Sequence, residues 1–589
     1  MWLESKTRIQ GYRTNEARRR AWMCALMLTC ALVTCVVTAE AKTARQPQKR
    51  TPAPASQRRT SSAPAAVAAQ VLQEIAGLLH TGRLAEAEAL ARQAVVSSPG
   101  DSQAHTLLGV VLDQLSRSEE AEREYREALR LNPRNASAHA NLGVLLVRTN
   151  RPDKAIEAFE TALRLAPGHI QAAYNLGALY SASGDFKRAV PLLEGAAGVR
   201  AGTPTRSEND PSLMLMLVKA YLLGGETEEG GRLAATIESA NANDSRVLFS
   251  LGLVLAEAHD YNGAVRLFQR RDALGPNTFE VLYNLGVALY NLDQLDEASN
   301  VLERAAALRP SDAETLYRLG LVASARKQSE LALGLWQKAV ELRPQFPEAN
   351  FMIAEELFKH ERFQTAIPFY KLAVEQSPDQ LVYYIRYGAA HFRRKRYEEA
   401  RAVYEQAVKR FPQVPQLHYL VGYAARGEGD YGGASAAFHR ALELDPNNAD
   451  AIANLGYIAS EQGNSEEAEK LLRRAITLNA KLYPPHYDLG RLLVRLKRYE
   501  EGVQVLQGSA VMNANDPGVH YQLFIALSRL KRKEDAQREL ATFQKLESVR
   551  KTRQRSEDAK ESQSSDDPAL PDPSMTLPAD TLDLKLRKP

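Results

Sequence analysis

Apolar residues recur along most of the chain at the spacing of helices that bury one face. In one stretch, two apolar stripes flank the sequence Asn-Arg-Pro-Asp at 150–153: Leu142, Leu145 and Leu146, then Ala155, Phe159 and Ala162. Residues three and four positions apart share one face of an α-helix, whereas Pro and Asn interrupt helices. The stretch therefore predicts two antiparallel helices joined by a short turn.

This two-helix pattern repeats with a period of 34 residues. Gly109, Gly143 and Gly177 are 34 residues apart, and the interval from Gly252 to Gly490 is seven times 34. Counting outward places fourteen repeats between residues 68 and 550, interrupted by seven extra residues. Because a fixed period of this length indicates stacked repeats, it replaces the usual expectation of several independent domains.

Small residues hold fixed places in the repeat. The eighth position is Gly in ten of the fourteen repeats, the twentieth is Ala in twelve and the thirty-second is Pro in nine. In the third repeat, Gly143 and Ala155 allow the two helix backbones to approach, and Phe159 fills the layer between neighbours. Enlarging either small residue should overpack the contact and cost roughly 1–3 kcal/mol.

These residues resemble the tetratricopeptide repeat. Its pattern is met by Asn141-Leu142-Gly143, Ala155, Phe159, Ala162 and Pro167, and the resemblance covers about four-fifths of the chain. The resemblance implies an all-α fold, a right-handed superhelical solenoid of stacked antiparallel helix hairpins. It also implies that the first helices line a concave groove that binds peptides or other protein segments. The physics agrees, because a hairpin can bury its apolar face only against its neighbours.

The fifth and sixth positions of the repeat supply the candidate partner-binding residues. In relatives such as the O-linked N-acetylglucosamine transferases, sixth-position asparagines hydrogen-bond a peptide backbone. By resemblance, the candidates are Asn141, Tyr174, Asn175, Tyr283, Asn284, Tyr317, Arg318, Arg386, Tyr419, Asn454 and Tyr487. Two alternatives stay open: Asn-Leu-Gly is also the common repeat sequence, and the rings can instead pack against the next hairpin. The chaperone-tail clamp of the family is rejected, because Asn284 and Arg318 match only fragments of it.

Basic residues gather in the turns between the two helices of the later repeats. Equivalent turns of a solenoid share one rim, so we expect a basic rim that includes Arg393, Arg394, Lys395, Arg396, Lys497 and Arg498. Such a rim is a candidate site for an anionic partner. The alternative is that these charges compensate the carbonyl ends of the first helices and keep the chain soluble.

The N-terminal residues predict export. Residues 21–38 carry no charge and follow three arginines, and Ala39-Glu40-Ala41 would allow cleavage, so residues 1–41 predict a signal peptide. An uncleaved membrane anchor is the alternative, because 18 uncharged residues reach the lower limit for crossing a bilayer. Both place the rest of the chain outside the cytoplasm, in a periplasmic or other extracytoplasmic compartment of a probable bacterial cell.

Composition divides the remainder into further segments. Residues 42–67 and 551–589 are rich in polar residues and Pro and predict a disordered linker and a disordered tail. Repeats one to four occupy 68–203 and repeats five to fourteen occupy 211–550. The insertion, 204–210, adjoins the Gly-rich fifth repeat and predicts a flexible joint that proteases cut between Ala201 and Ser212.

Composition also argues against several functions. A net charge of only +4 disfavours a dedicated nucleic-acid binder. Cys24, Cys30 and Cys35 all lie in the apolar N-terminal stretch, so no thiol chemistry is available after Cys35. Eleven histidines are scattered, mostly at different repeat positions, without a metal-binding pair, and phosphate-binding loops and serine elbows are missing. We expect no metal, no cofactor and no catalysis.

The sequence thus predicts a non-enzymatic protein-binding scaffold of the cell envelope, whose partner it does not identify. An alternative is a binder of anionic polysaccharide, or of lipid headgroups at a membrane surface, through the basic rim. A third hypothesis, an enzyme with an unrecognised site, has no residue to nominate.

Overall fold

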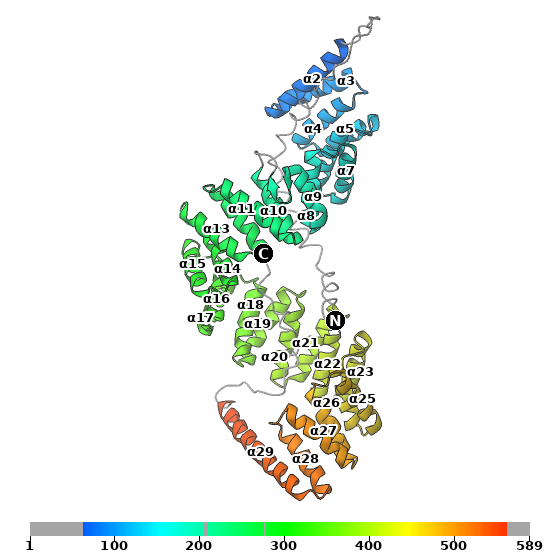
Figure 1. Ribbon diagram of the computed structural model, residues 1–589, viewed down its shortest axis with the longest axis vertical. Coiled ribbons are helices and arrows are strands. Elements are labelled where there is room, and N and C mark those ends of the chain that lie inside the picture. The colour runs from blue at the N-terminus through cyan, green and yellow to red at the C-terminus, as the bar shows by residue number, and fades with distance from the viewer. Residues whose placement is uncertain (1–62, 205–209, 276–277, 562–589) are drawn as a thin grey trace. The chain divides into compact units, whose positions relative to one another are not determined.

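The computed structural model describes residues 63–204, 210–275 and 278–561. The chain divides into two compact parts, residues 1–288 and 289–589, called here the N-terminal part and the C-terminal part. Within each part, first helices pack on the second helix of their own repeat, and second helices pack on the first helix of the next repeat (Figure 1). In the described residues thirteen helix pairs pack as hairpins within one part or the other, which confirms the all-α class and the stacked hairpins. The handedness of the whole array stays a prediction.

The N-terminal part holds the first six hairpins and most of the following helix. Its elements are α2 (Ala63–His80), α3 (Leu84–Ser97), α4 (Ser102–Gln114), α5 (Ser118–Leu131), α6 (Ala136–Arg148), α7 (Pro152–Leu165), α8 (Ile170–Ser183), α9 (Phe186–Ala197), β1 (Val199–Arg200), β2 (Thr203–Pro204), α10 (Pro211–Gly224), α11 (Thr227–Ala240), α12 (Ser245–Glu257), α13 (Tyr261–Ala273) and α14 (Phe279–Asn291).

The C-terminal part continues the same alternation of first and second helices. Its helices are α15 (Leu295–Leu308), α16 (Ala313–Ala325), α17 (Ser329–Leu342), α18 (Pro347–Lys359), α19 (Phe363–Gln376), α20 (Leu381–Arg393), α21 (Tyr397–Arg410), α22 (Pro415–Glu428), α23 (Tyr431–Leu444), α24 (Ala449–Glu461), α25 (Ser465–Leu478), α26 (Tyr483–Arg495), α27 (Tyr499–Met512), α28 (Pro517–Arg529) and α29 (Lys533–Glu561).

The eighth-position glycines lie against a large side chain from the second helix of the same hairpin. A Cβ atom on Gly143 would lie 2.6 Å from the Phe159 ring, and one on Gly109 would lie 2.6 Å from the Tyr125 ring. The twentieth-position alanines, such as Ala155, are fully buried in the same contact. Because these positions have no room for another carbon, the fixed small residues have the steric cause that their spacing suggests.

Turn chemistry sets where each helix begins. Asp or Asn precedes many of the first helices and caps them; the side chain of Asn135 accepts from the Ala138 N–H, and that of Asp312 accepts from the Thr315 N–H. The residue two before each second helix turns the chain with a positive φ, as at Asn150 (59°) and Lys497 (63°). These caps and turns fix the length of each repeat.

A short β-hairpin ends the fourth repeat, and only its last residue, Pro204, falls in the predicted insertion. Strands β1 and β2 pair antiparallel, with Val199 opposite Pro204. The turn between them is bound to its neighbours, since the Ala201 N–H donates to Glu194 Oε1 (2.8 Å) and the Gly202 N–H donates to Tyr221 Oη (3.1 Å). The expectation that no strand occurs is therefore wrong at these residues. The rest of the proposed joint, residues 205–209, lies outside the described residues.

Both predicted boundaries of the repeat array differ from the structure. Helix α2 begins at Ala63, inside the segment predicted as a disordered linker, and α29 continues to Glu561, beyond the predicted end of the array at residue 550. None of the described helices combines the length and the apolar character needed to cross a membrane. The predicted signal or anchor, residues 1–41, lies outside the described residues.

Replacing Gly320 by Ala should lower the free energy of unfolding by about 1–3 kcal/mol, because the new Cβ would meet the buried indole of Trp336. Gly334→Ala is the matched control in the second helix of the same repeat, where an added Cβ meets nothing within 4 Å. The control should gain up to about 1 kcal/mol from helix propensity. Chemical denaturation followed by circular dichroism measures both, and equal effects would contradict the steric explanation.

Candidate functional site

The fifth-position tyrosines differ in exposure. Tyr174, Tyr283 and Tyr487 are half-buried, whereas Tyr317 and Tyr419 are only 6% and 7% exposed. The Tyr317 ring packs 5.0 Å from the ring of Phe346, at the end of the same repeat. For Tyr317 and Tyr419 the expectation of rings that anchor a partner is wrong, and the packing alternative describes them.

The sixth-position asparagines use their side-chain amides within their own helices. The Nδ2 groups of Asn175, Asn284 and Asn454 each donate to the carbonyl four residues earlier, at 2.8 Å in all three cases. Asn141 is half-buried. This bond occupies one amide hydrogen and leaves the other hydrogen and the Oδ1 oxygen to contact neighbours.

Two sixth-position arginines are held by carboxylates of the chain itself. Arg386 forms a two-pronged ion pair with Glu355, with Nε–Oε1 at 2.9 Å and Nη2–Oε2 at 2.7 Å. Arg318 pairs with Glu314 at 3.1 Å. These guanidinium groups are engaged, so the structure assigns both residues a structural contact and leaves their proposed partner contact untested.

A cluster of which the sequence singled out only Asn454 lies on the first helices of three consecutive repeats. Its members, called here the tyrosine–arginine cluster, are Tyr423 and Arg426 of α22, Asn454 and Tyr457 of α24, and Arg491 of α26. The Arg426 guanidinium carbon lies 4.8 Å from the centroid of the Tyr423 ring and 5.0 Å from that of Tyr457. Arg491 lies 5.5 Å from the same Tyr457 centroid.

Polar contacts fix this cluster in place. The Oδ1 atom of Asn454 accepts from Arg426 Nη1 at 2.5 Å. Arg491 pairs with Glu461 at 2.8 Å and lies 3.6 Å from Asp488. All five members are buried or half-buried, so the rings and guanidinium groups are held with part of their surface open to a ligand. Tyr423, Tyr457 and Arg491 share the ninth repeat position, a regularity that would have revealed them.

The predicted basic rim is largely engaged with acids and rings. Arg498 donates to Glu469 and to Glu501, each at 2.6 Å. Arg393 has a side chain only 14% exposed and lies 4.7 Å from the centroid of the Phe363 ring. Arg394 and Arg396 are half-buried, and Lys395 and Lys497 are exposed at the turns. Arg393 and Arg498 are therefore held by contacts within the chain, and contact of the rim with an anionic partner stays a prediction.

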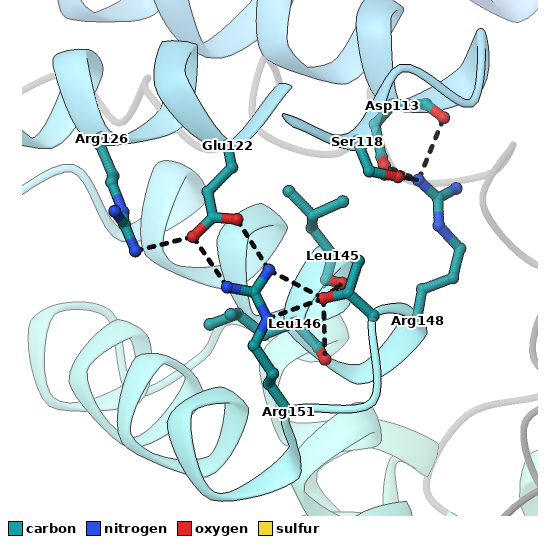
Figure 2. A network of polar contacts seen from close by, with 9 residues as sticks. Asp113, Ser118, Glu122, Arg126, Leu145, Leu146, Arg148 and Arg151 are labelled. Carbon is teal, nitrogen blue, oxygen red and sulfur yellow. Dashed lines mark hydrogen bonds and ion pairs between the residues drawn. The ribbon is translucent and has the colours of Figure 1, made fainter. Parts of the chain in front are cut away.

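The arginines that precede the second helices connect neighbouring repeats. Arg117 pairs with Glu88 of the repeat before it at 2.7 Å, as Arg498 does with Glu469. Figure 2 shows the same arrangement one repeat after Arg117, where Arg151 points from its turn to Glu122 of α5. Their ion pair is 2.7 Å long. Because the residues recur with the period, these ion pairs join second helices along the stack.

Five histidines share the fourth repeat position, contrary to the expectation that most stand at different positions. The Nε2 atom of each lies 3.0–3.2 Å from the carbonyl oxygen six residues earlier: His105, His139, His418, His486 and His520. Each such contact joins a first helix to the turn before it. Among the described residues, no group of three His, Cys, Asp or Glu side chains is placed to hold a metal ion.

Comparison with known proteins shows that the chain carries tetratricopeptide repeats. Two tetratricopeptide repeat models match, one at residues 72–136 and 106–170 and the other at 146–204 and 255–320. The model of the cilia and flagella-associated protein 70 C-terminal domain matches residues 326–565, so this region is similar to that domain. None of these ranges includes the fifth repeat, which departs from the pattern.

Solved structures match the chain at low identity and low TM-score. The Cut9–Hcn1 hetero-tetramer of the APC/C is 15% identical with a TM-score of 0.31, covering 79% of this chain and 97% of that chain. Yeast Tom70 is 16% identical with a TM-score of 0.29 and coverage of 74% and 96%. Naa15/Naa10 bound to HypK-THB is 15% identical with a TM-score of 0.31 and coverage of 82% and 81%. No curated protein matches the sequence.

Replacing Asp488 by Asn should stabilise the fold in a pH-dependent way. Burial raises the pKa of Asp488 from 3.8 to about 6. Between these values the folded chain holds a proton that the unfolded chain has released, so stability falls as pH rises from about 4 to about 6. Asn cannot ionise, and its advantage should reach up to about 3 kcal/mol at pH 8 and vanish near pH 4. Denaturation curves across this range measure it, and a constant difference would contradict the assignment.

Proposed function

We propose that the protein is a non-catalytic scaffold that binds protein segments along the faces of its first helices. Tetratricopeptide-type scaffolds generally mediate protein–protein interaction. The observation that carries the proposal for this chain is the tyrosine–arginine cluster, in which half-buried rings and a guanidinium are held in fixed positions on three successive first helices.

The chemistry of the cluster suits a protein ligand. Tyrosine and arginine contribute most of the binding energy at many protein interfaces, because each combines a large contact area with polar groups at its tip. Side chains that are already fixed lose little conformational entropy when a ligand arrives. The half-buried Tyr174, Tyr283 and Tyr487 extend the same chemistry to other repeats.

A buried carboxylate outside this face is held as a junction between helices, which suits a scaffold. Glu356, 3% exposed, accepts from Ser324 Oγ at 2.8 Å and from Ser329 Oγ at 2.5 Å, and thereby joins α16, α17 and α18. Burial opposes ionisation, but the hydrogen bonds from Ser329 and Ser324 hold the pKa of Glu356 below its usual range. The carboxylate is enclosed by its own partners, as expected of a junction between helices.

We place the scaffold in the cell envelope. This part of the proposal rests on the sequence, on the uncharged residues 21–38 behind three arginines and the Ala39-Glu40-Ala41 site. N-terminal sequencing of the protein purified from its native cells tests it. A mature chain that begins at Lys42 indicates a cleaved signal, and an intact chain in the membrane fraction indicates an anchor. An intact chain in the cytosolic fraction would contradict export.

The double variant Tyr283→Ala, Asn284→Ala should weaken partner binding about tenfold or more while keeping the helical circular dichroism spectrum, because both residues are candidate contacts on one first helix. The partner is first identified by crosslinking in native cells, purified, and titrated against both proteins. Leu331→Ala is the matched control, since this residue is 54% exposed on the second helix α17. Unchanged affinity in the double variant would remove Tyr283 and Asn284 from the binding face.

A further inference from the structure

Arg426 differs from Arg386 and Arg491, two other half-buried arginines on first helices of the C-terminal part. Arg386 is neutralised by Glu355 and Arg491 by Glu461. Arg426 forms no ion pair with any carboxylate in the part of the chain that the structure describes, and its one hydrogen bond there is from Nη1 to Asn454 Oδ1. A half-buried cation without a counterion is unfavourable, because burial removes water that its charge would otherwise hold.

The nearest acids do not supply the missing charge. Glu461 and Asp488 both lie by Arg491, at 2.8 Å and 3.6 Å. Burial raises the pKa of Asp488, and the charges of Arg491 and Arg426 partly oppose that shift, but the contact that Asp488 makes is with Arg491. Asp450, in the first turn of α24, has a pKa raised by burial, and no neighbouring cation is among the causes of that shift. The remaining N–H groups of Arg426 therefore stay available for an acceptor from outside.

The surroundings of Arg426 hold it ready for a planar acceptor. The rings of Tyr423 and Tyr457 lie 4.8 Å and 5.0 Å from its guanidinium carbon, and Asn454 fixes one of its nitrogens. A guanidinium held in this way presents parallel N–H donors that match the two oxygens of a carboxylate. Tyr423 also stacks on Phe392, with ring centroids 5.1 Å apart, and Tyr457 meets the ring of Tyr431 at 6.4 Å. Both rings are only half-buried, so the exposed remainder of each is the surface on which neighbouring residues of a ligand can pack.

We propose that the tyrosine–arginine cluster binds the side-chain carboxylate of an Asp or Glu in a protein segment, with apolar residues of that segment packed on Tyr423 and Tyr457. The inference rests on the proposed function and names the chemistry of its ligand. The ligand carboxylate completes the ion pair that Arg426 lacks, and the segment crosses from α22 to α24. Recognition of an acidic residue in this way requires no free chain end.

The test uses the full chain and short peptides of the form Gly-X-Glu-X-Gly, with Leu, Phe or Tyr at X, acetylated and amidated so that only the side chain carries a carboxylate. Matched peptides carry Gln in place of Glu, and a third set carries Gln with a free C-terminal carboxylate. Fluorescence anisotropy of labelled peptides measures affinity. The Glu peptides should bind about tenfold more tightly than either Gln set. Their affinity should also fall as salt is raised, because the contact is partly exposed.

Arg426→Gln should abolish the preference for Glu, and Arg426→Lys should keep only part of it, because Lys retains the charge without the fork. The matched control is Arg401→Gln, on the second helix α21, whose guanidinium is already paired with Glu405, Glu428 and Asp430. The control should bind the Glu peptides as the unaltered chain does. Thermal unfolding of each variant checks that the repeats remain folded.

Several results would overturn the inference. If the unaltered chain binds the Glu peptides and the capped Gln peptides equally, the site does not recognise a side-chain carboxylate, whatever the variants do. A preference only for the free C-terminus would assign the site to a chain end instead. Loss of the preference in Arg401→Gln would show that the effect is one of general charge. The peptide tests can give one of these results while the purified partner still binds in a way that depends on Tyr283 and Asn284. In that case the proposed function stands and only the chemistry inferred at Arg426 is wrong.

Discussion

A glycine that faces a large buried side chain sets how closely the two helices of each hairpin approach, and the rest of the structure depends on this approach. In different hairpins the facing side chain is the ring of Phe159, the indole of Trp336 or the isobutyl group of Leu472. The glycine is kept in ten of the fourteen repeats while the residue that faces it varies, because backbone proximity there leaves no room for a Cβ but the facing space accepts several shapes. Hairpins of similar thickness then stack with equivalent residues in register.

That register explains why contacts between repeats recur with the period. Arg117 reaches Glu88, and Arg498 reaches Glu469, across the same interval of 29 residues. Each of these partly exposed pairs contributes little free energy by itself, because water screens it and long side chains must be ordered. Their regular placement, together with the histidine contacts to the preceding turns, specifies which helix faces which neighbour. From the sequence alone Arg498 counts as a rim charge, because a linear pattern shows the cation without the acid one repeat away.

Most of the fold could be predicted because period, apolar stripes and turn residues all indicate the same hairpin. The two ends of the array could not be predicted in this way. Helix α2 begins in an alanine-rich segment, and α29 continues through Lys, Arg, Glu and Gln; these residues favour a helix but form no apolar stripe. Exposure within the candidate site was also beyond the sequence. Tyr317 is covered by Phe346 from the end of its own repeat, whereas Tyr174, at the same position, stays half-buried. The difference in exposure between the two rings depends on the residues packed around each of them, which cannot be read from the repeat position alone.

The surroundings of Arg386 and Arg426 differ at the ninth position of one repeat and the sixth position of the next, although Arg386 is itself a sixth-position residue and Arg426 stands at the twelfth position. In the ninth and tenth repeats, Glu355 at the ninth position meets Arg386 at the sixth position of the next repeat, and the charges close on each other. In the eleventh and twelfth repeats the corresponding residues are Tyr423 and Asn454. Neither Tyr423 nor Asn454 carries a negative charge. They orient Arg426 through a ring and an amide but leave its positive charge without a counterion. The same scaffold geometry thus yields a closed structural contact in one place and an open, oriented cation two repeats later.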